Sequence, residues 1–165
     1  MGVPTAQMVR VITRELDSFE RELSLFPDDQ SIWATVPGVT NSAGNLAIHV
    51  AGGLQYLVGA VLGGTGYVRN RDAEFSRRSG TREEAIAELR KAATVVRDVL
   101  PRLTEQQLSA PFPEAMMGHT IPTDLFLLHL CVHAGFHLGQ AGYIRRVVTA
   151  NAASTGPLPL QPLAG

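Results

Sequence analysis

The sequence predicts an all-α protein built as a four-helix bundle, and three observations carry the prediction. Apolar residues recur at steps of three and four positions in four long segments, which is the period of a helix with one buried face. Capping residues, glycines and prolines begin and end these segments. No stretch of the chain shows the alternation of apolar and polar residues that indicates a half-buried strand.

The first helix is expected from Thr5 to Phe26. Its apolar residues share one face and most of its charged residues lie elsewhere, as expected for a helix that covers a core. Pro27 follows directly and ends the helix, because proline cannot continue it. Trp33 lies in the next connection, and we expect its large side chain to cover one end of the core.

The second helix is expected to begin after Asn41 or Ser42, since either side chain can accept hydrogen bonds from free N–H groups, and to last to about Leu62. Its interior contains three glycines, which are Gly52, Gly53 and Gly59. Each costs about 0.5–1 kcal/mol relative to alanine in a helix. We therefore expect close backbone approach by another helix, within the bundle or across a dimer interface. A loosely packed helix end is the alternative.

The third helix is expected from Thr81 to about Leu103. Thr81 and Glu84 have the spacing of a capping box, in which each side chain bonds the backbone N–H of the other residue. The polar stretch of residues 69–80 before this helix is expected to be a loop.

The fourth helix is expected to begin at Pro122, which suits the first turn of a helix, and to reach about Thr149. The prolines of the last stretch cannot continue it. We therefore expect one bundle domain over residues 1–150. Residues 151–165 are expected to be a proline-rich tail, either flexible or strapped over the bundle.

Charge and cysteine content exclude several classes of function. The chain carries 14 Lys and Arg against 15 Asp and Glu, so it has no basic excess for a nucleic-acid backbone. Cys131 is the only cysteine, which excludes an intrachain disulfide and a zinc site built from cysteines. The first residues lack the charged-then-apolar layout of a signal peptide, so we expect a cytoplasmic protein.

Two apolar stretches without charged residues, 43–62 and 125–144, approach the roughly 20 residues that span a bilayer. Both also carry histidine and amide side chains, which are costly in lipid. Charged amphipathic segments separate them. We therefore expect two nearly charge-free helices beside two charged ones, in a soluble bundle with a deep interior and no membrane partner. A membrane protein is the minor alternative.

Histidines supply the candidate chemistry. His129, His133 and His137 follow one another at four-residue steps on the expected fourth helix. Two imidazoles at this spacing can converge on one metal ion. The outer two are about 12 Å apart along the helix axis and cannot easily share an ion. The pairs His129–His133 and His133–His137 are both open on this argument.

A third ligand has to come from another helix, and the expected second helix offers His49. Apart from tyrosines, His49 is the only ionisable side chain between Asp29 and Arg69. A buried histidine must lose its charge or gain a partner, and metal coordination provides one. Two alternatives are a core histidine bonded to backbone or water, and a haem between His49 and a histidine of the fourth helix. His119, in a glycine-containing loop, is expected to be exposed.

These motifs resemble the signatures of a known superfamily. Residues 133–140 (HAGFHLGQ) resemble the His-x-x-x-His-x-Gly-Gln signature of DinB-like proteins, which are metal-binding four-helix bundles. YfiT-type hydrolases and bacillithiol transferases are relatives. Residues 45–52 (NLAIHVAG) are similar to the second-helix histidine motif, and residues 69–75 (RNRDAEF) resemble a stretch of one DinB-like subgroup. The resemblance covers roughly residues 5–149.

The resemblance implies that His49, His133 and His137 bind a divalent ion, for which we expect zinc or nickel. It also implies an up-down-down-up bundle that is often dimeric, so we expect a homodimer. Relatives of known chemistry use the ion in thiol-dependent transfer or in hydrolysis. Gly53 stands where the subgroup usually has a polar residue, which weakens any transfer of substrate contacts but not of the metal ligands.

Three histidine ligands leave a coordination position open, as catalytic sites do. No carboxylate lies near the histidines in the sequence to act as a general base, and thiol chemistry tolerates that absence better than hydrolysis does. We therefore favour thiol-dependent S-transfer on a small-molecule substrate, with a low-molecular-weight thiol as cosubstrate, over hydrolysis. A non-catalytic bundle, either a metal-binding module or a dimeric stress-response protein, is the alternative.

Neighbouring polar residues receive mainly structural interpretations. Gln140 can bond a ligand or another helix. Arg145 is expected to be a solvated charge near a helix end more than an anion-binding group. Three residues of the loop are expected to pair among themselves, namely Arg69, Arg71 and Asp72.

Three further side chains are assigned to the protein interior. Tyr56 and Tyr143 can line a cavity, but we favour a place in the aromatic core. Cys131 is expected to be a buried, inert thiol.

Overall fold

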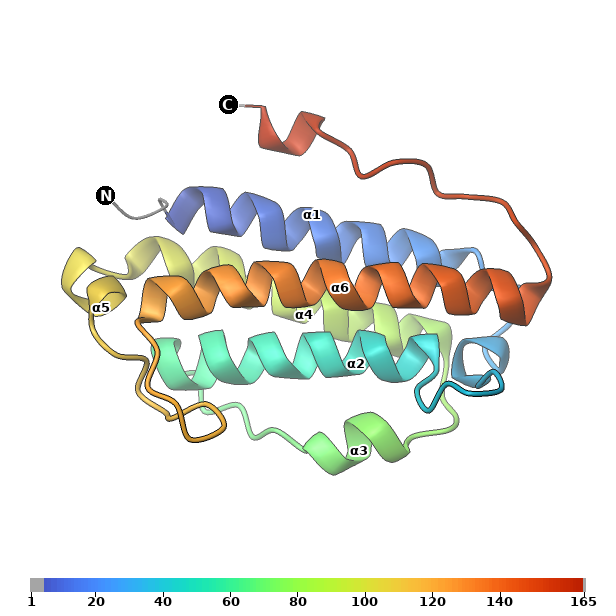
Figure 1. Cartoon of the computed structure of the whole chain (residues 1–165), viewed down its shortest axis with the longest axis horizontal. Helices are drawn as coiled ribbons and strands as arrows, with labels where there is room; N and C mark the ends of the chain where they lie inside the picture. The colour runs from blue at the N-terminus through green and yellow to red at the C-terminus, as the bar shows by residue number, and fades with distance from the viewer. Residues whose placement is uncertain (1–4, 165) are drawn as a thin grey trace.

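The computed structural model describes residues 5–164, and every regular element in this range is a helix or a helical turn. Four long helices make the bundle in Figure 1: α1 (Thr5–Ser24), α2 (Ala43–Leu54), α4 (Arg82–Val99) and α6 (Thr123–Thr149). A π-helical segment, η2 (Gln55–Leu62), continues α2 without a break. The short elements are α3 (Arg71–Ser76), α5 (Glu105–Ser109) and the 3₁₀ turns η1 (Ser31–Trp33), η3 (Leu100–Arg102) and η4 (Gln161–Leu163).

The long helices run up, down, down and up, as Figure 1 shows. α1 lies beside α4 and α6, and α2 lies beside the same two helices, so α1 and α2 occupy opposite corners of the bundle. α3 lies outside the bundle and packs on α2. The predicted all-α four-helix bundle is confirmed, because four amphipathic or wholly apolar helices bury their apolar faces against one another.

The helix starts follow the capping signals. Ser42, not Asn41, caps α2: its hydroxyl accepts from the N–H of Asn45, and the Asn45 side chain accepts from the N–H of Ser42, both at 3.1 Å. Thr81 and Glu84 form the predicted capping box of α4. Each box satisfies N–H groups that the first turn of a helix leaves without partners.

α2 and η2 form the interior helix of the bundle. Residues Ala43–Leu62 are long and apolar enough to cross a membrane, but 78% of their most apolar stretch is buried inside the fold. This burial is typical of a core helix, because its apolar side chains are already covered by protein on most sides. The expectation of a charge-free helix inside the bundle is confirmed for this stretch. The other stretch, residues 125–144, lies in α6 and exposes apolar side chains such as Val132 and Phe136.

The glycines of the interior helix do allow close approach. A Cβ atom on Gly59 would lie 3.0 Å from Cγ1 of Val95 in α4, so the two helices pack closely there. A Cβ atom on Gly52 would lie 2.4 Å from Oε1 of Glu74. At Gly52 the close neighbour is therefore a side chain of the short helix α3. The sequence analysis had expected the backbone of another long helix at this position.

The stretch expected as a loop, residues 69–80, contains a short helix, and so does the connection between α4 and α6. α3 lies within residues 69–80 and begins after Asn70, whose side chain accepts from the N–H of Ala73 at 3.0 Å. α5 begins after Thr104, which forms a capping box with Gln107. Helices of one or two turns are too short to show apolar periodicity, which is why the sequence pattern did not reveal them.

Arg145 is fully buried, so the prediction of a solvated charge was wrong. Its Nε donates to Oε2 of Glu22 at 2.6 Å, and its guanidinium also donates to the backbone carbonyl of Ala153. The hydroxyl of Thr155 donates to the other oxygen of Glu22 at 2.7 Å. The segment after α6 therefore returns along α1, as a strap tied to a buried ion pair (Figure 1).

The aromatic predictions had mixed outcomes. Trp33 is 3% exposed and its indole N–H donates to the carbonyl of Gly80 at 2.7 Å, so it covers one end of the core as predicted. Tyr56 is half-buried against the core. Tyr143 is 72% exposed, so its assignment to the core was wrong.

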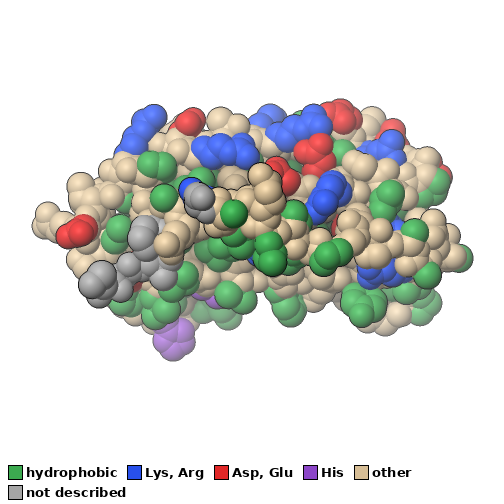
Figure 2. Space-filling model, turned by 90° about the horizontal axis from the view of Figure 1, so that it is seen from above, with side chains coloured by type: hydrophobic (Ala, Val, Ile, Leu, Met, Phe, Trp, Pro, Cys, Tyr) green, Lys and Arg blue, Asp and Glu red, His purple; other side chains and the backbone are tan. Residues whose placement is uncertain are grey.

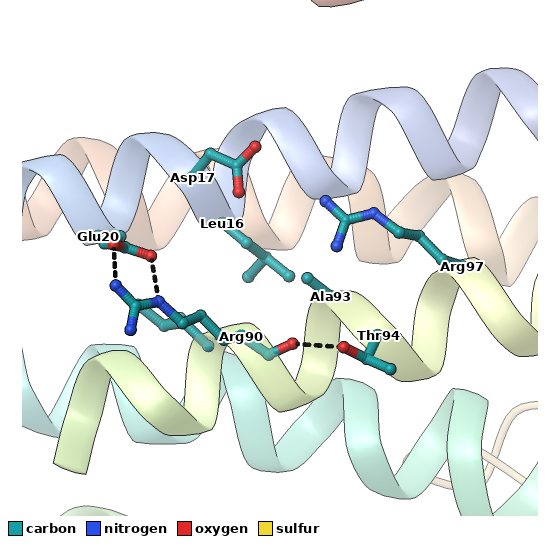
Figure 3. A pocket seen from close by; sticks show the side chains of 8 residues that line it. Leu16, Asp17, Glu20, Arg90, Ala93, Thr94 and Arg97 are labelled. Carbon is teal, nitrogen blue, oxygen red and sulfur yellow. Dashed lines mark hydrogen bonds and ion pairs between the residues drawn. The ribbon is translucent and has the colours of Figure 1, made fainter. Parts of the chain in front are cut away.

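Charged and apolar side chains gather on different sides of the bundle. Seen from above (Figure 2), charges follow one long edge of the molecule and hydrophobic side chains follow the other. A hollow of about 130 Å³ on the seam between α1 and α4 is bordered by an ion pair between Arg90 and Glu20 (Figure 3). Exposed apolar residues instead line α6, namely Leu125, Leu128, Val132, Phe136, Tyr143 and Val147.

Candidate metal centre

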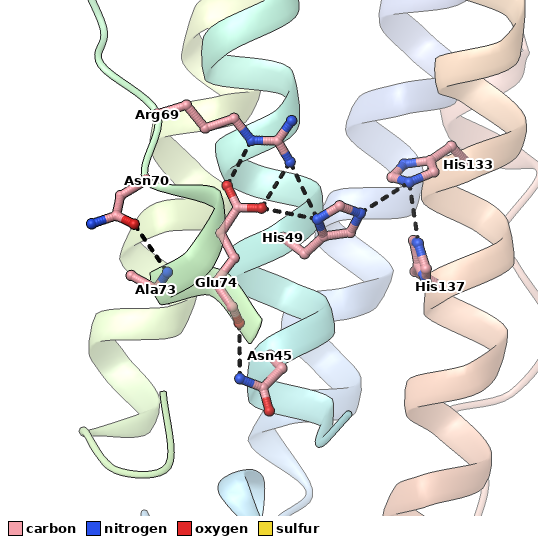
Figure 4. A network of polar contacts seen from close by, with 8 residues as sticks. All are labelled: Asn45, His49, Arg69, Asn70, Ala73, Glu74, His133 and His137. Atoms are coloured by element: carbon pink, nitrogen blue, oxygen red, sulfur yellow. Dashed lines mark hydrogen bonds and ion pairs between the residues drawn. The ribbon is translucent and has the colours of Figure 1, made fainter. Parts of the chain in front are cut away.

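Three histidines from two helices converge at the interface between α2 and α6 (Figure 4). Nε2 of His133 lies 3.2 Å from Nε2 of His49 and 3.1 Å from Nε2 of His137. One ligand atom from each of the three lies within 4.8 Å of the others. The structure thus brings together the three residues that the sequence motifs singled out.

The nitrogen separations fit a shared metal ion. A zinc–nitrogen bond is about 2.0–2.1 Å, so two nitrogens on one ion are separated by about 3.0–3.4 Å at the angles of common coordination geometries. The two contacts of His133 fall in this range. Imidazole donors suit zinc, copper, iron and nickel.

His129 lies outside this cluster. Its ring is exposed, stacks on Phe126 at a centroid distance of 5.8 Å and lies 6.0 Å from the ring of His133. The geometry therefore brings His133 and His137, and not His129 and His133, together with His49. His119 is exposed in the loop before α6, as predicted.

The surroundings favour neutral imidazoles, the form that coordinates a metal. Burial, together with the neighbouring histidines, lowers the pKa of His133 to about 3. Burial also lowers the pKa of His137, although a hydrogen bond to Gln140 works in the opposite direction. Two of the clustered rings are thus held neutral near pH 7.

A buried carboxylate stands behind the cluster, although the sequence pattern predicted none there. Oε2 of Glu74 accepts from Nδ1 of His49 at 2.9 Å, on the ring edge opposite to Nε2 (Figure 4). Arg69 donates to both oxygens of Glu74 at 2.7 Å. The predicted pairing of Arg69 with Arg71 and Asp72 was therefore wrong.

A sequence signal for Glu74 existed but was weak. Asn70 can cap a helix, acidic residues follow in the first turn, and Gly52 stands three residues after His49 on the expected second helix. Nothing in these patterns says that the two segments meet, because they are separated by a long connection and the contact is made in three dimensions.

Gln140 contacts the cluster, and Cys131 is a partly buried thiol on the same helix. Nδ1 of His137 donates to the side-chain oxygen of Gln140 at 2.7 Å, so Gln140 supports a ring of the cluster. Burial raises the pKa of the Cys131 thiol to about 11, which agrees with the prediction of an inert thiol.

A cavity of about 360 Å³ borders the cluster through Gln140. Leu46 and Ile144 supply apolar walls, and Thr40 and Asn41 supply polar groups. All of its lining side chains are uncharged. Its size falls in the range of small-molecule sites, which is about 300–1,000 Å³.

The geometry disagrees with a haem between α2 and α6. The ring centroids of His49 and His133 are 5.1 Å apart, and those of His49 and His137 are also 5.1 Å apart. Rings this close leave no room for a macrocycle between them, so the haem alternative is set aside.

Comparison with known proteins identifies the type of bundle. The sequence model of the DinB superfamily matches residues 12–141. A crystal structure described as that of a conserved protein from Enterococcus faecalis has the same fold, with a TM-score of 0.73. The match covers 91% of this chain and 99% of that one, at 18% sequence identity. A search of curated proteins finds no match.

Proposed function

The chain belongs to the DinB superfamily, and on this premise we propose that it binds one divalent metal ion, zinc or nickel, through His49, His133 and His137. The observation that carries the proposal is the convergence of three Nε2 atoms from two helices. Depressed pKa values at His133 and His137 support it, because neutral imidazoles do not repel a cation.

The chemistry we propose is thiol-dependent S-transfer. A divalent ion with three protein ligands keeps a position open and lowers the pKa of a thiol or water bound there. A hydrolase also needs a group that takes a proton from water. Glu74 is the carboxylate beside the cluster, and both of its oxygens are occupied by His49 and Arg69. This occupation favours transfer over hydrolysis.

The substrate class is inferred from the cavity that Gln140 lines. Its uncharged lining favours a small molecule whose bound part is neutral and partly apolar. We place the electrophilic substrate there and a low-molecular-weight thiol at the metal centre. Gln140 borders both and holds the ring of His137 with its side-chain oxygen.

Element analysis of the purified protein tests the metal, with His137→Ala as the test variant and His119→Ala as its matched control. We expect about one ion per chain in the wild type and in His119→Ala, and a large loss in His137→Ala. Equal metal content in the two variants contradicts the proposal. S-transfer to a small electrophile should then require both an added thiol and His137.

A non-catalytic, dimeric role is the second candidate, and the outer face of α6 favours the dimer. Its exposed apolar residues follow one another at steps that keep them on one side of the helix. No charged residue occurs between Asp124 and Arg145. We propose that two copies associate through this face. Val132→Glu should convert a dimer into a monomer in light scattering, whereas Asp98→Asn, on α4, should leave it unchanged.

A further inference from the structure

We propose that Glu74, held by Arg69, is a positioning residue that fixes the ring of His49 so that Nε2, and not Nδ1, points at the other two histidines. The consequence for metal affinity rests on the proposed function. The orientation and the tautomer of the His49 ring are independent of that function, and they can be measured without metal.

The tautomer is set by the charge of the carboxylate. Nδ1 of His49 lies 2.9 Å from Oε2 of Glu74 and 3.2 Å from a guanidinium nitrogen of Arg69. Arg69 donates to both carboxylate oxygens of Glu74, and such a forked guanidinium contact is made to an ionised carboxylate. An ionised carboxylate can only accept, so Nδ1 must carry the proton. Nε2 then keeps the lone pair that a metal ion binds.

Arg69 completes this assignment. Its Nε and one terminal nitrogen donate to the two oxygens of Glu74, each at 2.7 Å. A hydrogen of the same terminal nitrogen also reaches Nδ1 of His49 at 3.2 Å, so Arg69 and Glu74 compete for this ring atom. The contact with Glu74 is the shorter one, at 2.9 Å, and two acceptors with no proton between them repel at that distance, so Nδ1 keeps the proton. Arg69 thus holds Glu74 in place and keeps it ionised.

The segment that carries Glu74 is anchored independently of the histidine. Asn45, which is fully buried on α2, donates to the backbone carbonyls of Glu74 at 2.8 Å and Arg77 at 2.9 Å. The ring of Phe75 packs on the ring of His49 at a centroid distance of 4.7 Å. α3 therefore contacts the imidazole ring twice: Glu74 bonds its edge at Nδ1, and Phe75 packs against its face.

Gly52 makes room for the carboxylate. A Cβ atom on Gly52 would lie 2.4 Å from Oε1 and 3.2 Å from the carboxyl carbon of Glu74. Any other residue at position 52 would push Glu74 away from its seat on α2. Gly52 lies three residues after His49, so the same helical turn carries both the ring and the space for its partner.

The three histidines differ in this respect. His49 is 8% exposed and has a charged, buried partner, whereas His137 donates to the neutral, exposed side chain of Gln140. We infer that His49 is the ligand whose direction is set before an ion arrives. His133 and His137, one turn apart on α6, adjust to it.

Nuclear magnetic resonance of the metal-free protein tests the positioning directly. Nitrogen-15 shifts of His49 should show a single tautomer with the proton on Nδ1. Glu74→Leu should give a mixture of tautomers and weaken zinc binding by about 10–100-fold, measured by competition with a chelating dye. Glu74→Gln, which keeps an accepting oxygen, should lose less. Asp72→Asn, an exposed position on the same short helix, is the matched control and should change neither property.

Gly52→Ala gives a second test that leaves the polar residues intact. Alanine is the better helix former, so weaker zinc binding cannot come from a weakened α2. If Glu74→Leu fails to fold because Arg69 loses its partner, the double variant Arg69→Met/Glu74→Leu replaces it. A wild type with the proton on Nε2 of His49 overturns the inference, and so does unchanged zinc affinity in both Glu74→Leu and Gly52→Ala. A wild type with the expected tautomer that binds no zinc overturns the proposed function instead.

Discussion

Two arginine–glutamate pairs, each with a buried carboxylate, have different roles in this molecule. Glu22 and Arg145 join α1 to α6, and their remaining hydrogen bonds go to Ala153 and Thr155 of the tail. Glu74 and Arg69 lie against α2, and the carboxylate also accepts from the ring of His49. The chemistry of the two pairs is the same. The role of each pair depends on its third partner, which is backbone and hydroxyl in one case and a candidate metal ligand in the other.

The largest effect is expected at the first pair. Arg145→Met should lower the free energy of unfolding by about 3–5 kcal/mol, because it leaves the carboxylate of Glu22 buried without its counter-charge. Zinc affinity of the folded protein should stay close to that of the wild type. Chemical denaturation measures the first and dye competition the second. The double variant Arg145→Met/Glu22→Leu should regain most of the stability. If it does not, the cost of Arg145→Met does not come from the unpaired charge of Glu22.

The next effect is expected within the cluster. His133→Ala should weaken zinc binding by at least about 100-fold, since it removes the ring that contacts both of the others. His129→Ala, one turn away and exposed, should leave zinc affinity within about twofold of wild type. Titration with zinc measures both. A loss at His129→Ala as large as that at His133→Ala would make His129 and His133 the ligand pair.

The next effect is the pH dependence of stability that His133 causes. Burial lowers the pKa of His133 to about 3, below its ordinary value of about 6.5 in an unfolded chain. Between these pH values the unfolded chain binds more protons, so the metal-free protein loses stability as the pH falls below about 6.5. The free energy of unfolding should fall by no more than about 2 kcal/mol from pH 7 to pH 5. Solvent reduces this value, because His133 is only partly buried. Chemical denaturation of the metal-free wild type and of His133→Asn at pH 7 and pH 5 measures this loss of stability. Equal losses in the two proteins would contradict the prediction.

The smallest effect is expected at the exposed pair on the seam between α1 and α4. Arg90 contacts Glu20 and Glu83, but its side chain is 57% exposed. Arg90→Ala should therefore change the free energy of unfolding far less than Arg145→Met does, and it should not affect zinc binding. Chemical denaturation of Arg90→Ala and Arg145→Met under the same conditions compares the two losses of stability. A cost as large as that of Arg145→Met would show that burial is not what separates these pairs.

The sequence identified the ligands of the cluster better than their support. The four-residue steps on α6 and the isolated His49 on α2 are local patterns that identified the candidate histidines and left two pairs open, and the resemblance to DinB-like proteins then chose His133 and His137. Glu74 could not be placed behind His49, because a short helix leaves no periodic signal. For the same reason Arg69 was paired with its neighbours in the chain and not with Glu74.

Arg145 shows the same limit on the other side of the bundle. An arginine near the end of a helix is typical of a solvated charge. Its burial depends on Glu22 from the first helix and on a tail that returns along α1, and both contacts join elements that only the folded chain brings together.

Local patterns in the chain were enough to establish the class of fold, the start of α4 and the candidate histidines of two helices, since apolar periodicity, capping and four-residue spacing are written in neighbouring residues. The packing of the helices was needed to establish which histidine pair meets His49, which carboxylate holds it and where Arg145 lies. A residue's partners across a packed interface are fixed by distances between helices, which no local pattern encodes.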